Sequence, residues 1–243
     1  MNPRLQQLAN KIAEKPIEKS GDLYHPIPFP EFSDLNTSCD QESAYRKWNI
    51  IYSFLGSPTD LNNFKVLDVG ANAGFYTFNF AKLGAHVSAF EPNDSYANLG
   101  KEITEISDLS VHWNMKAFEL TDIQGRAYNI ALLLSVFQWM SQGNDHLTQA
   151  SDILSSISAS SRIIFFELGC NYGKSAIQTD EKPIKWIWKL LSDHTSPKYM
   201  AYLGKVKSWK RGERYLFACT DVVLKNLTLS QRVMTYRLKH NWI

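Results

Sequence analysis

The chain has 243 residues, of which 44% are hydrophobic and 21% charged, and its 26 lysines and arginines nearly balance its 24 aspartates and glutamates. This length is enough for one full α/β domain with helices on both faces of a sheet, and it is short for two independent domains. The near-neutral charge excludes a global basic footprint for nucleic acid, and three widely spaced cysteines exclude a disulfide framework and give no zinc pattern.

Residues 1–56 form an extension before the first predicted strand. The sequence predicts one helix over Pro3–Glu14 and a second over residues 40–55, with Asp40 as its N-cap. The segment between them, Tyr24–Pro30, is stiff and extended because of its prolines. We expect this extension either to lie as a lid over a ligand cleft or simply to pack against the sheet.

A nucleotide-binding βαβ unit is predicted next. The run Val66–Val69, interrupted by Asp68, is short and apolar, as in a strand buried on both faces of a parallel sheet. Gly70 and Gly74 supply a tight turn, and the apolar spacing of residues 75–83 predicts a helix whose N-terminal amides face a ligand.

The second strand of this unit covers residues 86–90 and ends in Glu91. A carboxylate at that point can accept from both hydroxyls of a ribose. A dinucleotide fingerprint would need glycine where Asn72 stands and again at Phe75, so a pyrophosphate ligand is disfavoured.

The pattern D-x-G-x-N-x-G over Asp68–Gly74, followed by Glu91, resembles motif I of the class I S-adenosylmethionine-dependent methyltransferases. Its Gly-Ala-Asn-x-Gly form is similar to the FkbM-type and related sugar or natural-product methyltransferases. The resemblance covers residues 64 to about 220. It implies a doubly wound, seven-stranded, mostly parallel α/β sheet whose last strand is antiparallel.

The remaining elements can be placed on that fold. Three further strands are predicted at residues 110–116, at 128–139, where the strand runs into a loop, and at 161–169. A helix is predicted at 180–192. A closing hairpin pairs residues 199–206 with 214–220 across a turn at 210–213. We therefore expect an N-terminal helical extension over 1–56, a catalytic domain over 57–220, and a basic tail over 221–243 packed on that domain.

The resemblance implies S-adenosyl-L-methionine as the cofactor. Asp68 would approach its ammonium group or merely fix the loop, and Glu91 would hold the ribose. Adenine would rest between Pro92 and Phe118 and bond the amides of Ala117 and Phe118, or else Phe118 would simply be part of the core. The family's acid after the third strand is missing here. The full predicted cofactor set is Asp68, Gly70, Ala71, Asn72, Gly74, Phe75, Glu91, Pro92, Ala117, Phe118 and Ser135.

The general base has to be sought elsewhere, because Gln138 stands where related enzymes often carry histidine and glutamine cannot accept the proton. Glu167, at the exit of the fifth strand, and His146 are the catalytic candidates, with His25 behind them. The structural alternatives are a Glu167 paired with Lys174 or an arginine, and a His146 that caps a helix or lies on its surface.

The function predicted is O-methylation of a carbohydrate or other small biosynthetic intermediate. One alternative is a tRNA-modifying methyl- or carboxymethyltransferase, because the helix with Trp48 and the fourth strand also resemble the wobble-uridine carboxymethyltransferases and basic residues gather after residue 204. Another is a methyltransferase-like partner protein without catalysis.

The predicted location is the cytoplasm. The N-terminus lacks an apolar signal core, and the longest apolar stretch, residues 130–137, is too short to span a bilayer. The cysteines fit a reducing compartment. The oligomeric state and the acceptor stay open, and nucleic acid is a possible but less favoured partner.

Overall fold

The computed structural model describes residues 1–17, 23–38, 41–123, 125, 127–173, 175–208 and 212–243. The predicted cap Asp40, the residues Lys210 and Arg211 of the predicted hairpin turn, the proposed partner Lys174 and the thiol of Cys39 lie outside this part.

Within these described residues, seven strands form one sheet in the order β3-β2-β1-β4-β5-β7-β6. They are β1 Lys65–Val69, β2 His86–Phe90, β3 Val111–Asn114, β4 Tyr128–Leu134, β5 Ser161–Leu168, β6 Tyr199–Ser208 and β7 Gly212–Thr220. The pairs β1 with β2, β2 with β3 and β4 with β5 are parallel, whereas β7 is antiparallel to both β5 and β6. The predicted fold, a mostly parallel sheet whose last strand is antiparallel, is confirmed.

The chain divides into two compact units. The first comprises Met1–Trp48 and Pro58–Phe118, and the second comprises Asn49–Ser57 and Glu119–Ile243. The helices, in chain order, are α1 Pro3–Glu14, the 3-10 helix η1 Pro30–Phe32, α2 Gln41–Phe54, α3 Phe75–Ala81, α4 Asp94–Ser107, η2 Leu120–Ile123, α5 Phe137–Met140, α6 Leu147–Ser160, α7 Pro183–His194 and α8 Leu229–Lys239. The predicted division at residues 56 and 220 is a different one and stays a prediction.

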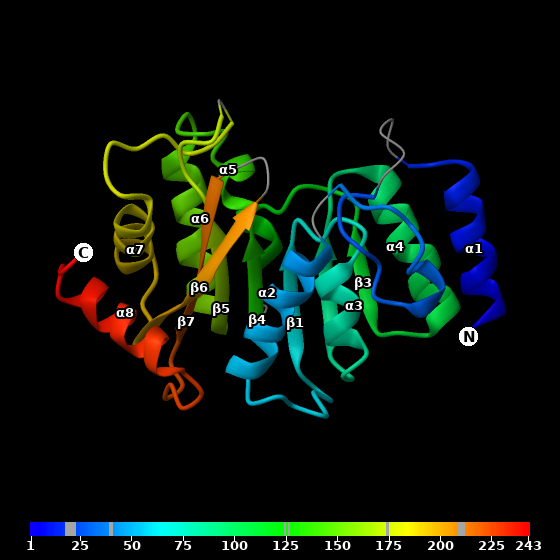
Figure 1. Ribbon diagram of the computed structural model, residues 1–243, viewed down its shortest axis with the longest axis horizontal. Helices are drawn as coiled ribbons and strands as arrows, with labels where there is room; N and C mark the ends of the chain where they lie inside the picture. Colours follow the sequence, from blue (N-terminus) through cyan, green and yellow to red (C-terminus); the bar gives the residue numbers. More distant parts are fainter. Residues whose placement is uncertain (18–22, 39–40, 124, 126, 174, 209–211) are drawn as a thin grey trace. The chain divides into compact units, whose positions relative to one another are not determined.

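In the first unit, the N-terminal extension contributes to the core. Helix α1 has the predicted bounds, and Asn2 caps it by accepting from the amide of Arg4 at 3.0 Å. Its apolar side chains share one core with those of α4 and β3, and α1 lies beside α4 (Figure 1). The members of this core from α1 are Leu5, Leu8, Ala9 and Ile12.

Gly100, on α4, leaves room for the indole of Trp113. A Cβ at this position would lie 2.2 Å from the Trp113 ring. Alanine gains about 1 kcal/mol in helix propensity, but overpacking costs about 1–3 kcal/mol or more. We expect Gly100→Ala to lower the free energy of unfolding and the thermal midpoint. Gly204→Ala is the control, because its Cβ would meet Ile50 at an ordinary 3.5 Å. Equal midpoints for both variants would contradict the expectation.

Several boundaries differ from the predicted ranges by a few residues, and two of these differences have a local reason. Helix α7 begins at Pro183 and not at residue 180, because proline suits the first turn of a helix and not its interior. Strand β4 ends at Leu134 because Ser135 adopts the left-handed conformation, with φ of 60°.

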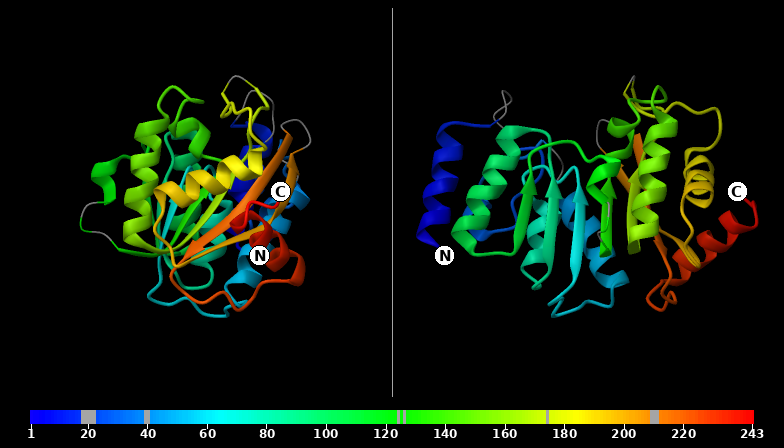
Figure 2. Two further views of the ribbon diagram at one scale, coloured as in Figure 1. Left: turned by 90° about the vertical axis from the view of Figure 1, so that its left-hand side faces the viewer. Right: turned by 180° about the vertical axis from the view of Figure 1, so that it is seen from behind.

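The second unit contains a helix that the sequence analysis did not predict. Helix α8 lies within the basic tail and contacts β6 (Figure 2). Strand β6 belongs to the hairpin with β7 and is an edge strand of the sheet. Thr228 and Gln231 form a capping box at its start. The amide of Tyr202 donates to Thr235 Oγ1 at 3.0 Å, and Gln231 Nε2 donates to the carbonyl of Leu203 at 2.7 Å. These bonds satisfy backbone groups that an edge strand otherwise exposes.

Candidate functional site

The loop between β1 and α3 is fastened to the end of β2. The amides of Gly70 and Ala71 both donate to the carbonyl of Phe90, at 2.9 and 3.0 Å. Gly74 has φ of 93°, and a Cβ there would lie 2.7 Å from the ring of Phe78. Glycine is therefore required at Gly74 both for its conformation and for the space it leaves.

Glu91 lies directly after β2 and connects this loop to the start of α4. Its Oε2 accepts from the amide of Asn72 and its Oε1 accepts from the amide of Asn93, both at 2.8 Å. The residue is only 8% exposed, and burial raises the pKa of its carboxyl group. Each carboxylate oxygen has more than one lone pair, so each can accept a further hydroxyl while it holds the loop.

Asp68, near the end of β1, is buried. Its Oδ2 accepts from Thr77 Oγ1 at 2.6 Å, which ties β1 to α3. Burial is the main cause that raises the pKa of Asp68, the bond from Thr77 opposes it and the charge of Glu91 adds to it, and together they bring the pKa to about 6. The structure thus provides the loop-fixing contact, and the contact to an ammonium group stays a prediction.

The raised pKa of Asp68 gives a pH prediction. Between its ordinary value of 3.8 and about 6, the folded state binds more protons than the unfolded state, so stability falls as pH rises through this window. The loss is at most about 3 kcal/mol, at 1.36 kcal/mol per pKa unit. If Asp68 contacts the cofactor's ammonium group as predicted, affinity for S-adenosylmethionine should rise over the same window, because only the ionised carboxylate would attract that group. Denaturant unfolding and calorimetry from pH 4 to about 7 would measure both, and Asp68→Asn should flatten both profiles.

Asn72 completes the loop with a left-handed φ of 53°. Its Oδ1 is buried and accepts no hydrogen bond from any residue in the described part of the chain. A buried acceptor of this kind calls for a donor. The amino-acid portion of the predicted cofactor carries such a donor, so the residues present fit that group.

The predicted adenine wall is only partly exposed. Phe118 is buried against Phe90, with ring centroids 4.8 Å apart, whereas Pro92 and Ala117 are exposed. Phe118 therefore makes the core contact that the alternative interpretation expected. Its contact with adenine stays a prediction.

Aromatic side chains support the start of α3. Phe75 is fully buried, and its ring lies 5.1 Å from that of Tyr45 and 4.9 Å from that of Tyr76. The ring of His25 is 6.4 Å from Phe75. The side chain of Phe75 thus packs in the core beneath the loop. Only the backbone of Phe75 is left for the predicted contact with the cofactor.

The second unit brings together a polar cluster at the ends of three strands. Arg214 Nη1, from β7, donates to Ser135 Oγ at 2.6 Å, and Ser135 Oγ donates to Glu167 Oε2 on β5. Glu167 is completely buried and Arg214 nearly so. The arginine that the sequence analysis allowed as a partner of Glu167 is therefore Arg214, which reaches the carboxylate through the hydroxyl of Ser135.

Neighbouring groups hold this cluster in place. Gln138 Nε2 donates to the carbonyl of Ser135 at 2.6 Å, and the Arg214 guanidinium lies 5.6 Å from the centre of the Tyr172 ring. A Cβ on Gly169 would lie 2.8 Å from the carbonyl of Glu213 and 3.1 Å from Arg214 Cγ. Gly169 thus permits the close approach of β7, a role for which the sequence analysis gave no signal.

His146, the other catalytic candidate, is exposed and stands at the N-cap of α6. Its side chain makes no capping hydrogen bond. His146 thus lies at a helix end, as the structural alternative expected, but its side chain does not cap the helix. Its catalytic role stays a prediction.

Two wider features concern metals and membranes. Within the described ranges, no group of three or more His, Cys, Asp or Glu side chains could hold a metal ion. None of the helices in those ranges has the length and apolar character needed to cross a membrane.

Comparison with known proteins gives weak sequence similarity and clear structural similarity. No family model matches the chain. It is 27% identical over 82 residues to the ubiquinone biosynthesis O-methyltransferase of Methylocella silvestris, which is 34% of this chain and 32% of that protein. The bifunctional kinase-methyltransferase WbdD superposes with a TM-score of 0.65 at 18% identity, covering 90% of this chain and 47% of WbdD.

A second solved structure, the N-terminal domain of EvdMO1 with S-adenosylhomocysteine (SAH) bound, has a TM-score of 0.58 at 13% identity over 90% of this chain and 97% of that domain. The chain therefore spans about a third of the curated relative and about half of WbdD. The fold is that of the class I S-adenosylmethionine-dependent methyltransferases.

Proposed function

We propose that the protein is an S-adenosylmethionine-dependent methyltransferase that methylates an oxygen atom of a carbohydrate or another small biosynthetic intermediate. The proposal rests on the position of Glu91. Its carboxylate is buried directly after β2, accepts from two loop amides and can still accept two hydroxyls. The class I methyltransferase fold, the SAH-bound neighbour and the similarity to an O-methyltransferase support it.

Residues of the first unit would hold the cofactor. Glu91 would bind the ribose, Asp68 and Asn72 the amino-acid portion, and Pro92 with Phe118 the adenine. When bound, the cofactor supplies a methyl group on an electrophilic sulfonium. The protein then has to align the acceptor oxygen and manage its proton, and alignment alone supplies much of the acceleration.

The second unit would serve the acceptor. Ser135 and Glu167 lie at the carboxyl ends of β4 and β5, the edge at which open α/β sheets bind ligands. We propose that the cluster of Ser135, Glu167 and Arg214 orients the acceptor, with Glu167 as the candidate base. The role of residues 1–56 as a lid, the packing of the tail over 221–243 on the catalytic domain and the cytoplasmic location belong to this proposal. Cys170 and Cys219, both buried free thiols, agree with a reducing compartment.

Calorimetric titration with S-adenosylmethionine, SAH and NAD tests the cofactor class. Micromolar binding of the first two and none of NAD is the expected result. Sugars, small metabolites and tRNA would then be screened as acceptors with radiolabelled methyl donor. Salt-sensitive tRNA methylation would favour the tRNA-modifying alternative, and no binding of either sulfur compound would favour a non-catalytic partner protein.

A further inference from the structure

Helix α8 presents one face to β6 and the opposite face to solvent. Thr235, Gln231 and the buried Leu238 face the sheet, the first two through the hydrogen bonds to β6. The inner face is therefore already in use. Whatever binds to this helix must approach its outer face.

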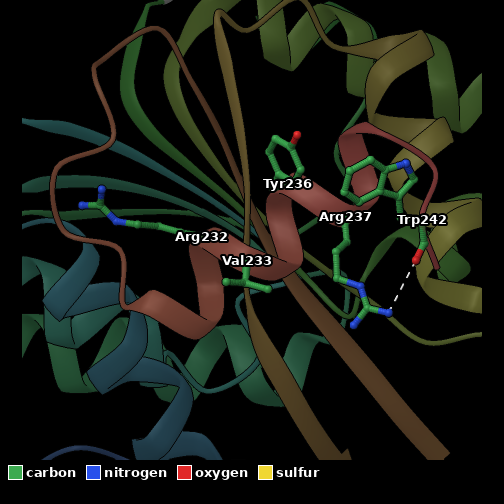
Figure 3. Close-up of a pocket in the computed structure, with 5 residues that line it drawn as sticks. All are labelled: Arg232, Val233, Tyr236, Arg237 and Trp242. Carbon is green, nitrogen blue, oxygen red and sulfur yellow. Dashed lines mark hydrogen bonds between the residues drawn. The ribbon is translucent and has the colours of Figure 1, made fainter.

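The outer face is unusually apolar for a solvated helix. Leu229 is 79% exposed, and Val233 and Tyr236 follow it at the helical spacings of four and three residues. Trp242, 63% exposed, continues the same surface beyond the helix, and its ring lies 5.3 Å from that of Tyr236. Together with Arg232 and Arg237, Val233, Tyr236 and Trp242 line an open hollow of about 670 Å³ (Figure 3).

Positive charges flank this apolar strip on both sides. At about 100° per residue, Arg232 and Lys239 fall along one side of the strip and Arg237 along the other. Figure 3 shows Arg232 and Arg237 toward opposite ends of the face, with Val233 and Tyr236 between them. Residues 222–243 contain no aspartate or glutamate, so their charge is uniformly positive.

We propose that this outer face of α8 binds an anionic membrane surface, with its apolar strip at the level of the lipid headgroups. Apolar and aromatic side chains bordered by arginine and lysine are the pattern of helices that lie in a membrane interface. Tryptophan and tyrosine favour that interface because their rings are amphipathic. The surrounding cations are attracted by the negative charge of the lipids.

Charge and geometry favour a membrane over protein partners. A second copy of the chain would bring arginines against arginines across a symmetric contact. The guanidinium of Arg232 already donates to the carbonyls of Leu227 and Lys225, and that of Arg237 donates to the carbonyl of Trp242. Guanidinium groups whose N–H groups are already used in this way are less suited to a two-pronged bond with one carboxylate, but they still attract a diffuse negative surface.

Vesicle co-sedimentation tests the proposal. The full chain should sediment with vesicles of equal parts phosphatidylcholine and phosphatidylglycerol, sediment far less with pure phosphatidylcholine, and dissociate as salt is raised. Leu229→Asp/Val233→Asp should lower the partition coefficient by roughly tenfold or more, since it places charge on the apolar strip. Circular dichroism and thermal melting would verify that this variant folds.

Two further variants keep the test independent of that substitution. Lys239→Gln leaves the apolar strip and the bond from Arg237 to the carbonyl of Trp242 intact, and it should also weaken binding, by roughly fivefold. Trp242→Ala should weaken binding, whereas Trp139→Ala, which removes an equally exposed tryptophan from α5, should not. The proposal fails if the chain does not sediment with anionic vesicles or if these α8 variants bind as the parent does. A dimer or a complex with single-stranded RNA that the α8 variants abolish, without vesicle binding, would also overturn it.

Discussion

Replacing Glu91 with glutamine is expected to abolish measurable binding of S-adenosylmethionine and SAH. The variant keeps the size of the side chain but loses the ionised acceptor that we propose for two ribose hydroxyls, and each such hydrogen bond to a charged group is worth about 1.5–3 kcal/mol. In the parent, both Glu91 oxygens accept from backbone amides, those of Asn72 and Asn93. In the variant, the side-chain nitrogen of glutamine replaces one of these oxygens and cannot accept. One loop amide therefore loses its partner, at a cost of about 1–3 kcal/mol.

Calorimetry measures the affinity, and we expect a loss of more than about 100-fold together with a lower thermal midpoint. Glu102→Gln is the matched control, since Glu102 is an exposed glutamate on α4 of the same unit. Unchanged SAH affinity in the Glu91 variant would show that the alignment of the loop with the cofactor is wrong. A lower midpoint with normal affinity would limit Glu91 to a structural role in the loop.

The loop on which the proposed cofactor site rests could be predicted because its signals are local. Gly70, Gly74 and Glu91 lie within one βαβ unit, and each is required by the conformation or the chemistry of its own position. Helix α1 could be predicted to its last residue, because four apolar residues at helical spacing follow a capping asparagine. Patterns of this kind need no knowledge of distant partners.

The cluster of Ser135, Glu167 and Arg214, which we propose orients the acceptor, could not be predicted in the same way. Arg214 and Ser135 are 79 positions apart, and Ser135 and Glu167 are 32 apart, so their contacts exist only once β4, β5 and β7 are paired. Helix α8 was missed because its inner face carries Gln231 and Thr235, which serve the polar edge of β6 and leave no apolar stripe facing the core. A pattern of hydrophobic residues cannot report an interface that is mainly hydrogen-bonded.

Replacing Arg214 with methionine is expected to destabilise the protein by about 3–5 kcal/mol, because a buried carboxylate loses its nearby positive charge. Glu167→Gln/Arg214→Met should recover part of that loss, since neither remaining side chain is charged. Denaturant unfolding of the two single variants and the double variant measures the coupling between the residues. Additive effects would contradict a charge interaction through Ser135.

Measuring turnover distinguishes a Glu167 that acts as general base from a Glu167 that only balances the charge of Arg214. If Glu167 takes the acceptor proton, Glu167→Gln should bind SAH as the parent does and turn over about 100-fold more slowly or worse, which is the usual contribution of a general base. The double variant should then regain stability without regaining turnover. We expect this result, because Ser135 is half-buried and gives an acceptor hydroxyl a hydrogen-bonded route to the inaccessible carboxylate. A double variant that recovers both stability and turnover would instead make Glu167 only the counter-charge of Arg214.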